Sequence, residues 1–393
     1  MSVKSTGRRK VIILFFFFAQ TIALTILGIG SSVAYANVPP DETSIVTPTD
    51  TVTSTPLAKL YGRVDLQGRP TPQPDESWEI PLDVSLSLPG ASTPKYTFAT
   101  STDANGEFLV EDIEPGAYDI RVKGFNTLSN LVRGVNLEPG ENPQFFGQLK
   151  SGDVELDLSF NRLVYDHDFN AFLTAQDKCE GDPGYDSIFD LYVDNCINVG
   201  DAGILLGNAP DWPDTPTEGD IDVTDVVGTT SFLTTTAGDS ALLSFNPSEK
   251  EVEVGEDTTV LLDVAPCCNS AMNAVDFTLS FSPTLIQVND VLIGQLPLVV
   301  NKTVDNSQGT VRFMVGIPGS VTETVTVAHL SFKAISSTSG AIITPTHFAV
   351  AGPSGLFSTT TTQSMTVKTK SSGSCGGGYC LYFPVIFKDS SPP

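Results

Sequence analysis

Oxygen-bearing side chains recur at fixed spacing between residues 190 and 201. Positions 1, 5, 9 and 12 of this twelve-residue stretch are Asp190, Asp194, Asn198 and Asp201, and the carbonyl of Cys196 falls at position 7. A calcium loop takes ligands from these positions because one twelve-residue turn wraps a single hard cation in oxygen atoms. The spacing therefore predicts a Ca²⁺ site.

Two further residues suit the turn and the anchoring of this loop. Asn195 stands where such loops usually have glycine, and asparagine tolerates the left-handed backbone conformation needed there. Ile197 is the apolar residue expected to pin the loop. Tyr192 departs from the pattern, because position 3 is normally asparagine or aspartate.

A second copy of the spacing begins 33 residues earlier, at Asp157. Its candidate ligands are Asp157, Ser159, Asn161 and Asp168. A different register is also open, in which Asp153, Glu155 and Asp157 are the ligands and a short insertion follows them. The first loop is therefore a Ca²⁺ candidate with two possible ligand sets.

An apolar, helix-like run follows each loop, FNAFLTA after the first and AGILLG after the second. Two calcium half-hands with this arrangement resemble a type I dockerin, over residues 151–212. The resemblance implies two calcium ions and docking onto cohesin modules. The alternative is a degenerate dockerin that folds without metal and is stapled by a Cys179–Cys196 disulfide.

Short alternating runs bounded by turn residues fill residues 59–150 and predict a β-sandwich. Within them, TDANGEFLVEDIEPGAYDIRVKG (102–124) resembles the carboxypeptidase regulatory-like module, a transthyretin-like sandwich also called a carbohydrate-binding-like fold. The Asn-Gly pair at 105–106 suits a tight hairpin. We expect Phe108 and Tyr118 to pack in the core and at a sandwich corner.

Longer alternation returns in residues 241–370. VDFTLSF (275–281) and TVRFMVG (310–316) each place alternate apolar residues on one face, as a half-buried strand does. The stretch NAVDFTLSFSPTLIQVNDV resembles cohesins, which implies a nine-stranded jelly roll with one sheet face that holds a dockerin. A generic immunoglobulin-like spacer is the alternative.

The expected fold class is therefore mainly β, with two β-sandwich domains (transthyretin-like and cohesin-like jelly roll) flanking a small α-helical, calcium-loop, dockerin-like segment. The expected divisions are an export signal at 1–36, a Thr/Pro linker at 37–58, the first sandwich at 59–150, the dockerin-like pair at 151–212, a linker at 213–240, the second sandwich at 241–370 and a spacer with a short hydrophobic tail at 371–393.

The N-terminus predicts export. A basic start is followed by the apolar run VIILFFFFAQTIALTILGIG and by Ala-Tyr-Ala at 34–36, the order of a secretory signal. An uncleaved membrane anchor is the alternative, since about 20 apolar residues can span a bilayer. We expect a secreted or cell-surface protein, in which Cys179–Cys196 and Cys375–Cys380 are candidate disulfides. The pairing of Cys267 and Cys268 is left open.

Composition and motifs narrow the function. A formal net charge of −25 argues against nucleic-acid binding. No G-x-S-x-G motif occurs, and the three histidines, His167, His329 and His347, stand apart, so we predict no enzyme. We expect a calcium-dependent interaction or scaffold protein whose partners are cohesin or dockerin modules of other proteins or of the same protein. We expect it to be associated with polysaccharide binding or catabolism, with a possible membrane or cell-wall tether.

Carbohydrate binding, or a structural role at the cell surface with a degenerate dockerin, is the alternative function. Trp78 and Tyr96 are the aromatic residues considered for a sugar platform, and isolated aromatics of this kind are more often part of a core.

Overall fold

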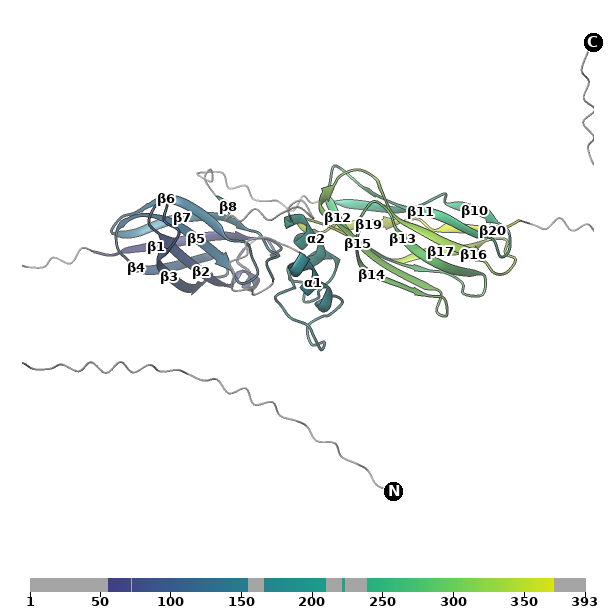
Figure 1. Ribbon diagram of the computed structural model, residues 1–393, viewed down its shortest axis with the longest axis horizontal. Coiled ribbons are helices and arrows are strands. Elements are labelled where there is room, and N and C mark those ends of the chain that lie inside the picture. Colours follow the sequence, from purple (N-terminus) through teal and green to yellow (C-terminus); the bar gives the residue numbers. More distant parts are fainter. Residues whose placement is uncertain (1–55, 72, 155–165, 210–220, 223–238, 371–393) are drawn as a thin grey trace, which may run out of the picture. The chain divides into compact units, whose positions relative to one another are not determined.

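The computed structural model describes residues 56–71, 73–154, 166–209, 221–222 and 239–370. The segments expected as export signal and C-terminal tail lie outside the described residues, as do Cys375, Cys380 and most of both expected linkers. Strands dominate the described part, in two groups of arrows, and two α-helices lie between these groups in sequence (Figure 1). The mainly β fold class predicted from the sequence is confirmed.

The N-terminal sandwich, residues 58–149 with 221–222, has a three-stranded sheet of order β4-β1-β7 and a five-stranded sheet of order β3-β2-β5-β6-β8. Its elements are β1 (Ala58–Leu66), the 3₁₀ helix η1 (Glu76–Trp78), β2 (Pro81–Ser87), β3 (Pro94–Ser101), β4 (Glu107–Ile113), β5 (Gly116–Gly124), β6 (Asn130–Leu137), β7 (Gly140–Leu149) and β8 (Ile221–Asp222). The two residues of β8 pair in parallel with β6 and belong to the stretch expected to be a linker.

The side chains that the sequence placed in the core of this sandwich are buried. Phe108 is 5% exposed and Tyr118 is 2% exposed, and the Tyr118 hydroxyl donates to the Glu114 carbonyl at 2.8 Å, which makes the expected corner. Gly106 has φ +78, as its tight turn requires. Trp78 is 2% exposed and donates to the Pro70 carbonyl, so it is a core residue and not a platform.

The C-terminal sandwich, residues 240–369, packs a seven-stranded sheet against a five-stranded sheet. Its strands are β9 (Ser240–Asn246), β10 (Glu249–Val252), β11 (Asp257–Pro266), β12 (Met272–Ser280), β13 (Ile286–Ile293), β14 (Leu298–Asp305), β15 (Thr310–Val321), β16 (Val325–Ala334), β17 (Ala341–Gly352), β18 (Gly355–Leu356), β19 (Thr359–Thr362) and β20 (Met365–Thr369). The described residues therefore hold twelve strand segments where nine were expected, because the chain is interrupted by short pieces such as β18 and β19.

Alternation in β12 and β15 produces the predicted core. Val275, Phe277 and Leu279 of β12 are fully buried, and Phe313 of β15 lies with its ring centroid 5.9 Å from that of Phe277. In β12, however, the residues between them are buried too: the pattern from Met272 onward is six buried residues in a row. A strand buried on both faces needs a second layer above it.

The helical segment, residues 166–209, supplies that layer. It contains α1 (Asp166–Ala175) and α2 (Val199–Asn208), which coincide with the two runs predicted to be helical. Neither of these helices is long and apolar enough to cross a membrane. Every residue of α2 from Val199 to Leu206 is buried, because the helix lies between its own small core and strands β12, β15 and β17.

Candidate calcium loop and docked helix

The second predicted loop brings its carboxylates together. Asp190, Asp194 and Asp201 each offer an oxygen atom, and these atoms all lie within 4.8 Å of one another. Asp190 and Asp201 are buried, whereas Asp194 is exposed to solvent. Three converging carboxylates supply part of the oxygen shell that a hard divalent cation takes.

The electrostatics of this cluster fit a cation. Burial raises the pKa of Asp201 to about 7, backbone N–H groups of Asn198 and Tyr192 oppose the rise, and the charges of Asp190 and Asp194 add to it. A buried carboxylate beside two others is costly to ionise without a positive partner. A divalent ion held by these three residues would supply the missing charge.

Backbone amides shape the loop around the carboxylates. Tyr192 N and Asn198 N donate to the two oxygens of Asp201 at 2.8 and 2.7 Å, while the amides of Asp194 and Asn195 donate to Asp190 at 3.2 and 3.0 Å. Asn195 has φ +67, as the sequence predicted for the residue in the glycine position. The loop is therefore formed by contacts of its own acidic residues.

Asn198 and Cys196, the other two predicted ligands, lie beside the cluster. The Asn198 amide nitrogen donates to Asp194 at 2.8 Å and to the Cys196 carbonyl at 3.4 Å. The Asn198 side-chain oxygen accepts from Gly200 N at 2.7 Å and, with Asp201, forms the capping box of α2. Two predicted ligands therefore also start the helix that follows, so the loop and α2 are one unit.

Residues outside the twelve-residue pattern also reach the cluster. The Tyr185 hydroxyl donates to Asp190 at 2.9 Å; burial raises the pKa of Tyr185, and the Asp190 carboxylate raises it further. The charge of Asp190 also acts on Arg69 of the N-terminal sandwich, whose pKa burial lowers. No spacing rule marks either residue, because both come from outside the loop.

Tyr192, the residue that departs from the ligand pattern, has a packing role. A Cβ added to Gly355 would lie 2.2 Å from a Tyr192 ring carbon, so the ring lies directly on the backbone of the C-terminal sandwich. At position 3 this loop therefore exchanges a ligand side chain for a contact with another part of the chain.

The first predicted loop is largely outside the described residues, which applies to Asp157, Ser159 and Asn161. Asp168, its last candidate ligand, is buried in α1 and accepts from Val154 N at 2.8 Å. Asp153, from the alternative register, pairs with Lys123 of the N-terminal sandwich. The described residues thus bring together one candidate metal cluster, in the second loop.

A disulfide joins Cys179 to Cys196, as predicted, and ties the second loop to the turn after α1. Cys267 and Cys268, whose pairing the sequence left open, are bonded to each other in the connection between β11 and β12.

Helix α2 docks onto the outer face of strands β12, β15 and β17. Ala351, Ala274 and Gly316 lie side by side across these strands and form a row with almost no side-chain height. Ala274, Ala351 and Met314 are fully buried beneath the helical segment. We call this surface, comprising Asn273, Ala274, Met314, Gly316 and Ala351, the docking face.

Polar contacts fix the helical segment on the docking face. Asn273 donates its amide to the carbonyl of Gly203 in α2 at 2.9 Å. Arg312 of β15 donates two hydrogen bonds to Asp177, at 2.8 and 2.6 Å, and two to Asp276, at 2.9 and 3.4 Å. Asp177 follows α1 with φ +62, a backbone conformation that glycine adopts with less strain than other residues. The advantage of aspartate at this position is its carboxylate, which binds Arg312.

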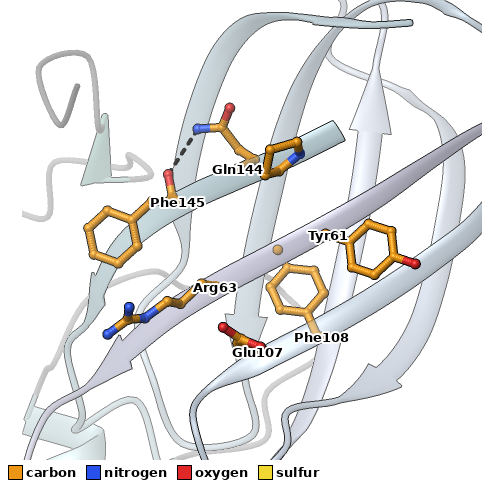
Figure 2. Close-up of a pocket in the computed structure, with 8 residues that line it drawn as sticks. Tyr61, Arg63, Glu107, Phe108, Gln144 and Phe145 are labelled. Atoms are coloured by element: carbon orange, nitrogen blue, oxygen red, sulfur yellow. Dashed lines mark hydrogen bonds between the residues drawn. The ribbon is translucent and has the colours of Figure 1, made fainter. Parts of the chain in front are cut away.

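A shallow groove of about 490 Å³ lies on the outer side of the three-stranded sheet of the N-terminal sandwich. Figure 2 shows Tyr61 and Arg63 pointing in different directions along β1, with Phe145 near Arg63 and Gln144 hydrogen-bonded to the Phe145 carbonyl. Tyr61 is 40% exposed, and Arg63 Nε is buried without a hydrogen-bond partner. The groove thus combines an exposed aromatic ring with an unsatisfied donor.

No family model matches the chain, and no curated protein matches it. Among solved structures, it is similar to a type II cohesin–X–dockerin complex from Acetivibrio cellulolyticus (18% identity, 39% of this chain and 95% of that chain, TM-score 0.32). It is also similar to a type I cohesin–dockerin complex from Clostridium thermocellum (11%, 34% and 93%, TM-score 0.30) and to a non-cellulosomal cohesin from Archaeoglobus fulgidus (16%, 34% and 93%, TM-score 0.28).

Proposed function

We propose that this chain is a non-catalytic interaction protein that acts outside the cell, in which a calcium-binding, dockerin-like segment docks onto a cohesin-like sandwich. The observation that carries the proposal is the burial of α2 on the docking face. The helix that follows the candidate calcium loop packs on a row of small residues, and this close packing supports specific recognition between the helical segment and the C-terminal sandwich.

The calcium part of the proposal rests on the second loop. Asp190, Asp194 and Asp201 would hold the ion, and Asn198, which hydrogen-bonds to both Asp194 and the Cys196 carbonyl, lies beside them. The ion would neutralise the buried carboxylates of the cluster. Because Asn198 and Asp201 also cap α2, calcium would stabilise the docking helix as well as the loop.

The extracellular part rests on the sequence order of the N-terminus and on the cysteines. A basic start, an apolar run and an A-x-A site support export, and the described disulfides suit an oxidising compartment. Partners of the same chemistry, cohesin-like or dockerin-like modules of other chains, are part of this proposal.

Calorimetric titration of the full chain with Ca²⁺ tests the metal site. We expect binding in the wild-type protein, and Asp194→Ala should weaken it by about tenfold or more because one ligand charge is lost. Glu180→Gln, which changes an exposed acid of the same segment outside the loop, is the control and should bind as the wild type does. Equal affinity in all three proteins would remove Asp194 from the site, and no heat in any of them would end the calcium proposal.

Hydrogen exchange of the full chain tests whether calcium supports docking. With chelator, peptides from α2 should lose protection together with peptides from β12, since each covers the other. Peptides from β13, on the opposite sheet, should be unchanged. Unchanged protection of α2 with chelator would show that docking does not need calcium. Loss of protection in α2 with none in β12 would show that the helix does not cover the strand.

Saccharide binding is a second candidate function, favoured by the groove in Figure 2. An exposed Tyr61 ring could stack on a sugar in this groove. Native gels with soluble xylan, β-glucan or pectin should retard the wild type and not Tyr61→Ala, with Leu292→Ala on the C-terminal sandwich as the control. Equal mobility with and without each polysaccharide would exclude these three ligands at the groove.

A further inference from the structure

The helical segment contacts both sandwiches, and we propose that in this chain it is a joint that holds the two sandwiches to each other rather than a helix kept free for another protein. Its partner is therefore the chain's own docking face, together with the end of β1. This inference rests on the proposed function only in its calcium dependence; the contacts that form the joint do not involve the metal site.

The fit between α2 and the docking face leaves no room for side chains. A Cβ added to Gly203 would lie 2.5 Å from Ala351 Cβ and 2.9 Å from the Gly352 carbonyl oxygen, and one added to Gly207 would lie 2.8 Å from Pro353 Cβ. From the other side, a Cβ on Gly316 would lie 2.3 Å from Leu206 Cδ1. Each surface is shaped to the backbone of the other.

Glycine at positions 203 and 207 is informative because both lie inside a helix. Alanine is the better helix former, so a helix that stayed in solvent would gain from it at either position. Neither glycine needs a positive φ, since both have ordinary helical backbone. Close approach to Ala351 and Pro353 is the reason that remains for their small size.

The other side of the helical segment is attached to the N-terminal sandwich through one buried side chain. Gln67, directly after β1, is 7% exposed; its oxygen accepts from Asn208 Nδ2 at 2.6 Å and from Ser151 N at 3.0 Å. Its nitrogen donates to the Pro353 carbonyl of the C-terminal sandwich at 2.6 Å. A single amide thus connects all three parts of the chain.

Apolar packing follows the same route. A Cβ on Gly68 would lie 2.1 Å from the Leu191 carbonyl oxygen and 2.8 Å from Ile204 Cδ1, so the turn after β1 lies directly on the helical segment. Leu128, next to β6, belongs to the same buried cluster as α2 and Met314. The cluster is continuous from one sandwich to the other, and this continuity is what makes the segment a joint.

The sign of one substitution separates a joint from a free helix. In the calcium-loaded full chain, Gly203→Ala should lower the melting temperature by about 5 °C and increase the radius of gyration measured by small-angle X-ray scattering, because the sandwiches separate. Gly340→Ala is the control: its new Cβ would have nothing nearer than Thr366 Cγ2 at 3.7 Å, and neither quantity should change. An unchanged or higher melting temperature with unchanged scattering in Gly203→Ala would overturn the joint.

A second variant changes the contact of the helical segment with the N-terminal sandwich and leaves the sequence of α2 intact. Gln67→Met keeps the length of the side chain and removes its hydrogen bonds to Asn208 and Pro353. We expect the variant to have a larger radius of gyration than the wild type. We also expect its two sandwiches to unfold in separate calorimetric peaks, whereas those of the wild type should unfold in one. A radius and a single peak identical to those of the wild type would contradict the joint even if Gly203→Ala failed to fold.

Chelator distinguishes failure of the joint from failure of the proposed function. If both hold, removing calcium from the wild type should increase its radius of gyration towards that of Gly203→Ala. If no calcium binds and Gly203→Ala still separates the sandwiches, the joint stands and only its calcium dependence is lost. Calcium binding with scattering that neither chelator nor either variant changes would remove the joint and leave the metal site.

Discussion

Two outward-facing sheet surfaces of this chain differ in what covers them. On the three-stranded sheet of the N-terminal sandwich, Tyr61 and Leu109 are 40% and 38% exposed. On the docking face, Ala274 and Met314 are fully buried. Both surfaces belong to strands with the usual alternation, so hydrophobic periodicity does not separate them. The difference lies in side-chain height: a row of alanine and glycine admits a helix backbone, and a row containing tyrosine and leucine does not.

The largest expected effect comes from placing a charge on each surface. Met314→Lys would bury an ammonium group beneath the helical segment and should lower the free energy of unfolding by about 3 kcal/mol, or release the segment. Leu109→Lys on the open surface should change it by less than about 0.5 kcal/mol. Urea titrations of the two variants measure both values. If Met314→Lys were as harmless as Leu109→Lys, the docking face would be open to solvent like the other.

A smaller effect is expected from the ion pair at the edge of the docking face. Arg312 and Asp177 are each about one-third exposed, so solvent screens their attraction. A double-mutant cycle with Arg312→Ala and Asp177→Ala should give a coupling energy of about 1 kcal/mol, because the pair is bidentate.

The same cycle on Lys368 and Glu249, an exposed pair on β20 and β10 of the same sandwich, is the comparison and should give a value near zero. Equal coupling in the two pairs would mean that Arg312 gains nothing from its place at the docking face.

The smallest effect is a pH dependence at the same edge. The hydrogen bond and charge of Asp276 raise the pKa of His347, with burial and Arg312 opposing them. A histidine whose folded pKa exceeds its unfolded value of about 6.5 stabilises the fold below that pH, and the contribution disappears as pH rises through the folded pKa.

His347→Gln should therefore lower the free energy of unfolding by less than about 1 kcal/mol at pH 5.5 and leave it unchanged at pH 8.5, because the side chain is half exposed. The difference between variant and wild type at each pH, from urea titrations in saturating calcium, cancels other titrating groups. A difference that grows with pH would mean that the pKa of His347 is lowered in the fold.

Much of this fold follows from period-two patterns, because burying one face of a strand requires only that alternate residues be apolar. Val275 and Phe313 were placed in the core for that reason, and they lie there. The convergence of Asp190, Asp194 and Asp201 was also predictable, since the spacing of a twelve-residue loop is a local property of the chain.

The docking face was not predictable in this way. Ala274 and Gly316 look like ordinary solvent-side positions of strands, and Gly203 looks like a tolerated glycine in a weak helix. The small size of these residues is explained only by the packing of α2 on the strands, and this packing joins residues more than sixty positions apart in the sequence. Tyr192 was unpredictable for the same reason. Its side chain does not fit the ligand pattern of the loop, and its role, packing on Gly355, depends on a residue far away in the sequence.

The pairing of β1 with β7 is parallel, and these are the first strand of the N-terminal sandwich and the last before the helical segment. In the C-terminal sandwich the parallel pairs are β9, its first strand, with β19, and β10 with β20, its last strand. A pull on the two ends of the N-terminal sandwich would slide β1 and β7 past each other and strain all of their hydrogen bonds at once, instead of opening them one by one. Under mechanical tension the N-terminal sandwich is therefore loaded in shear, whereas the first and last strands of the C-terminal sandwich, β9 and β20, belong to different sheets.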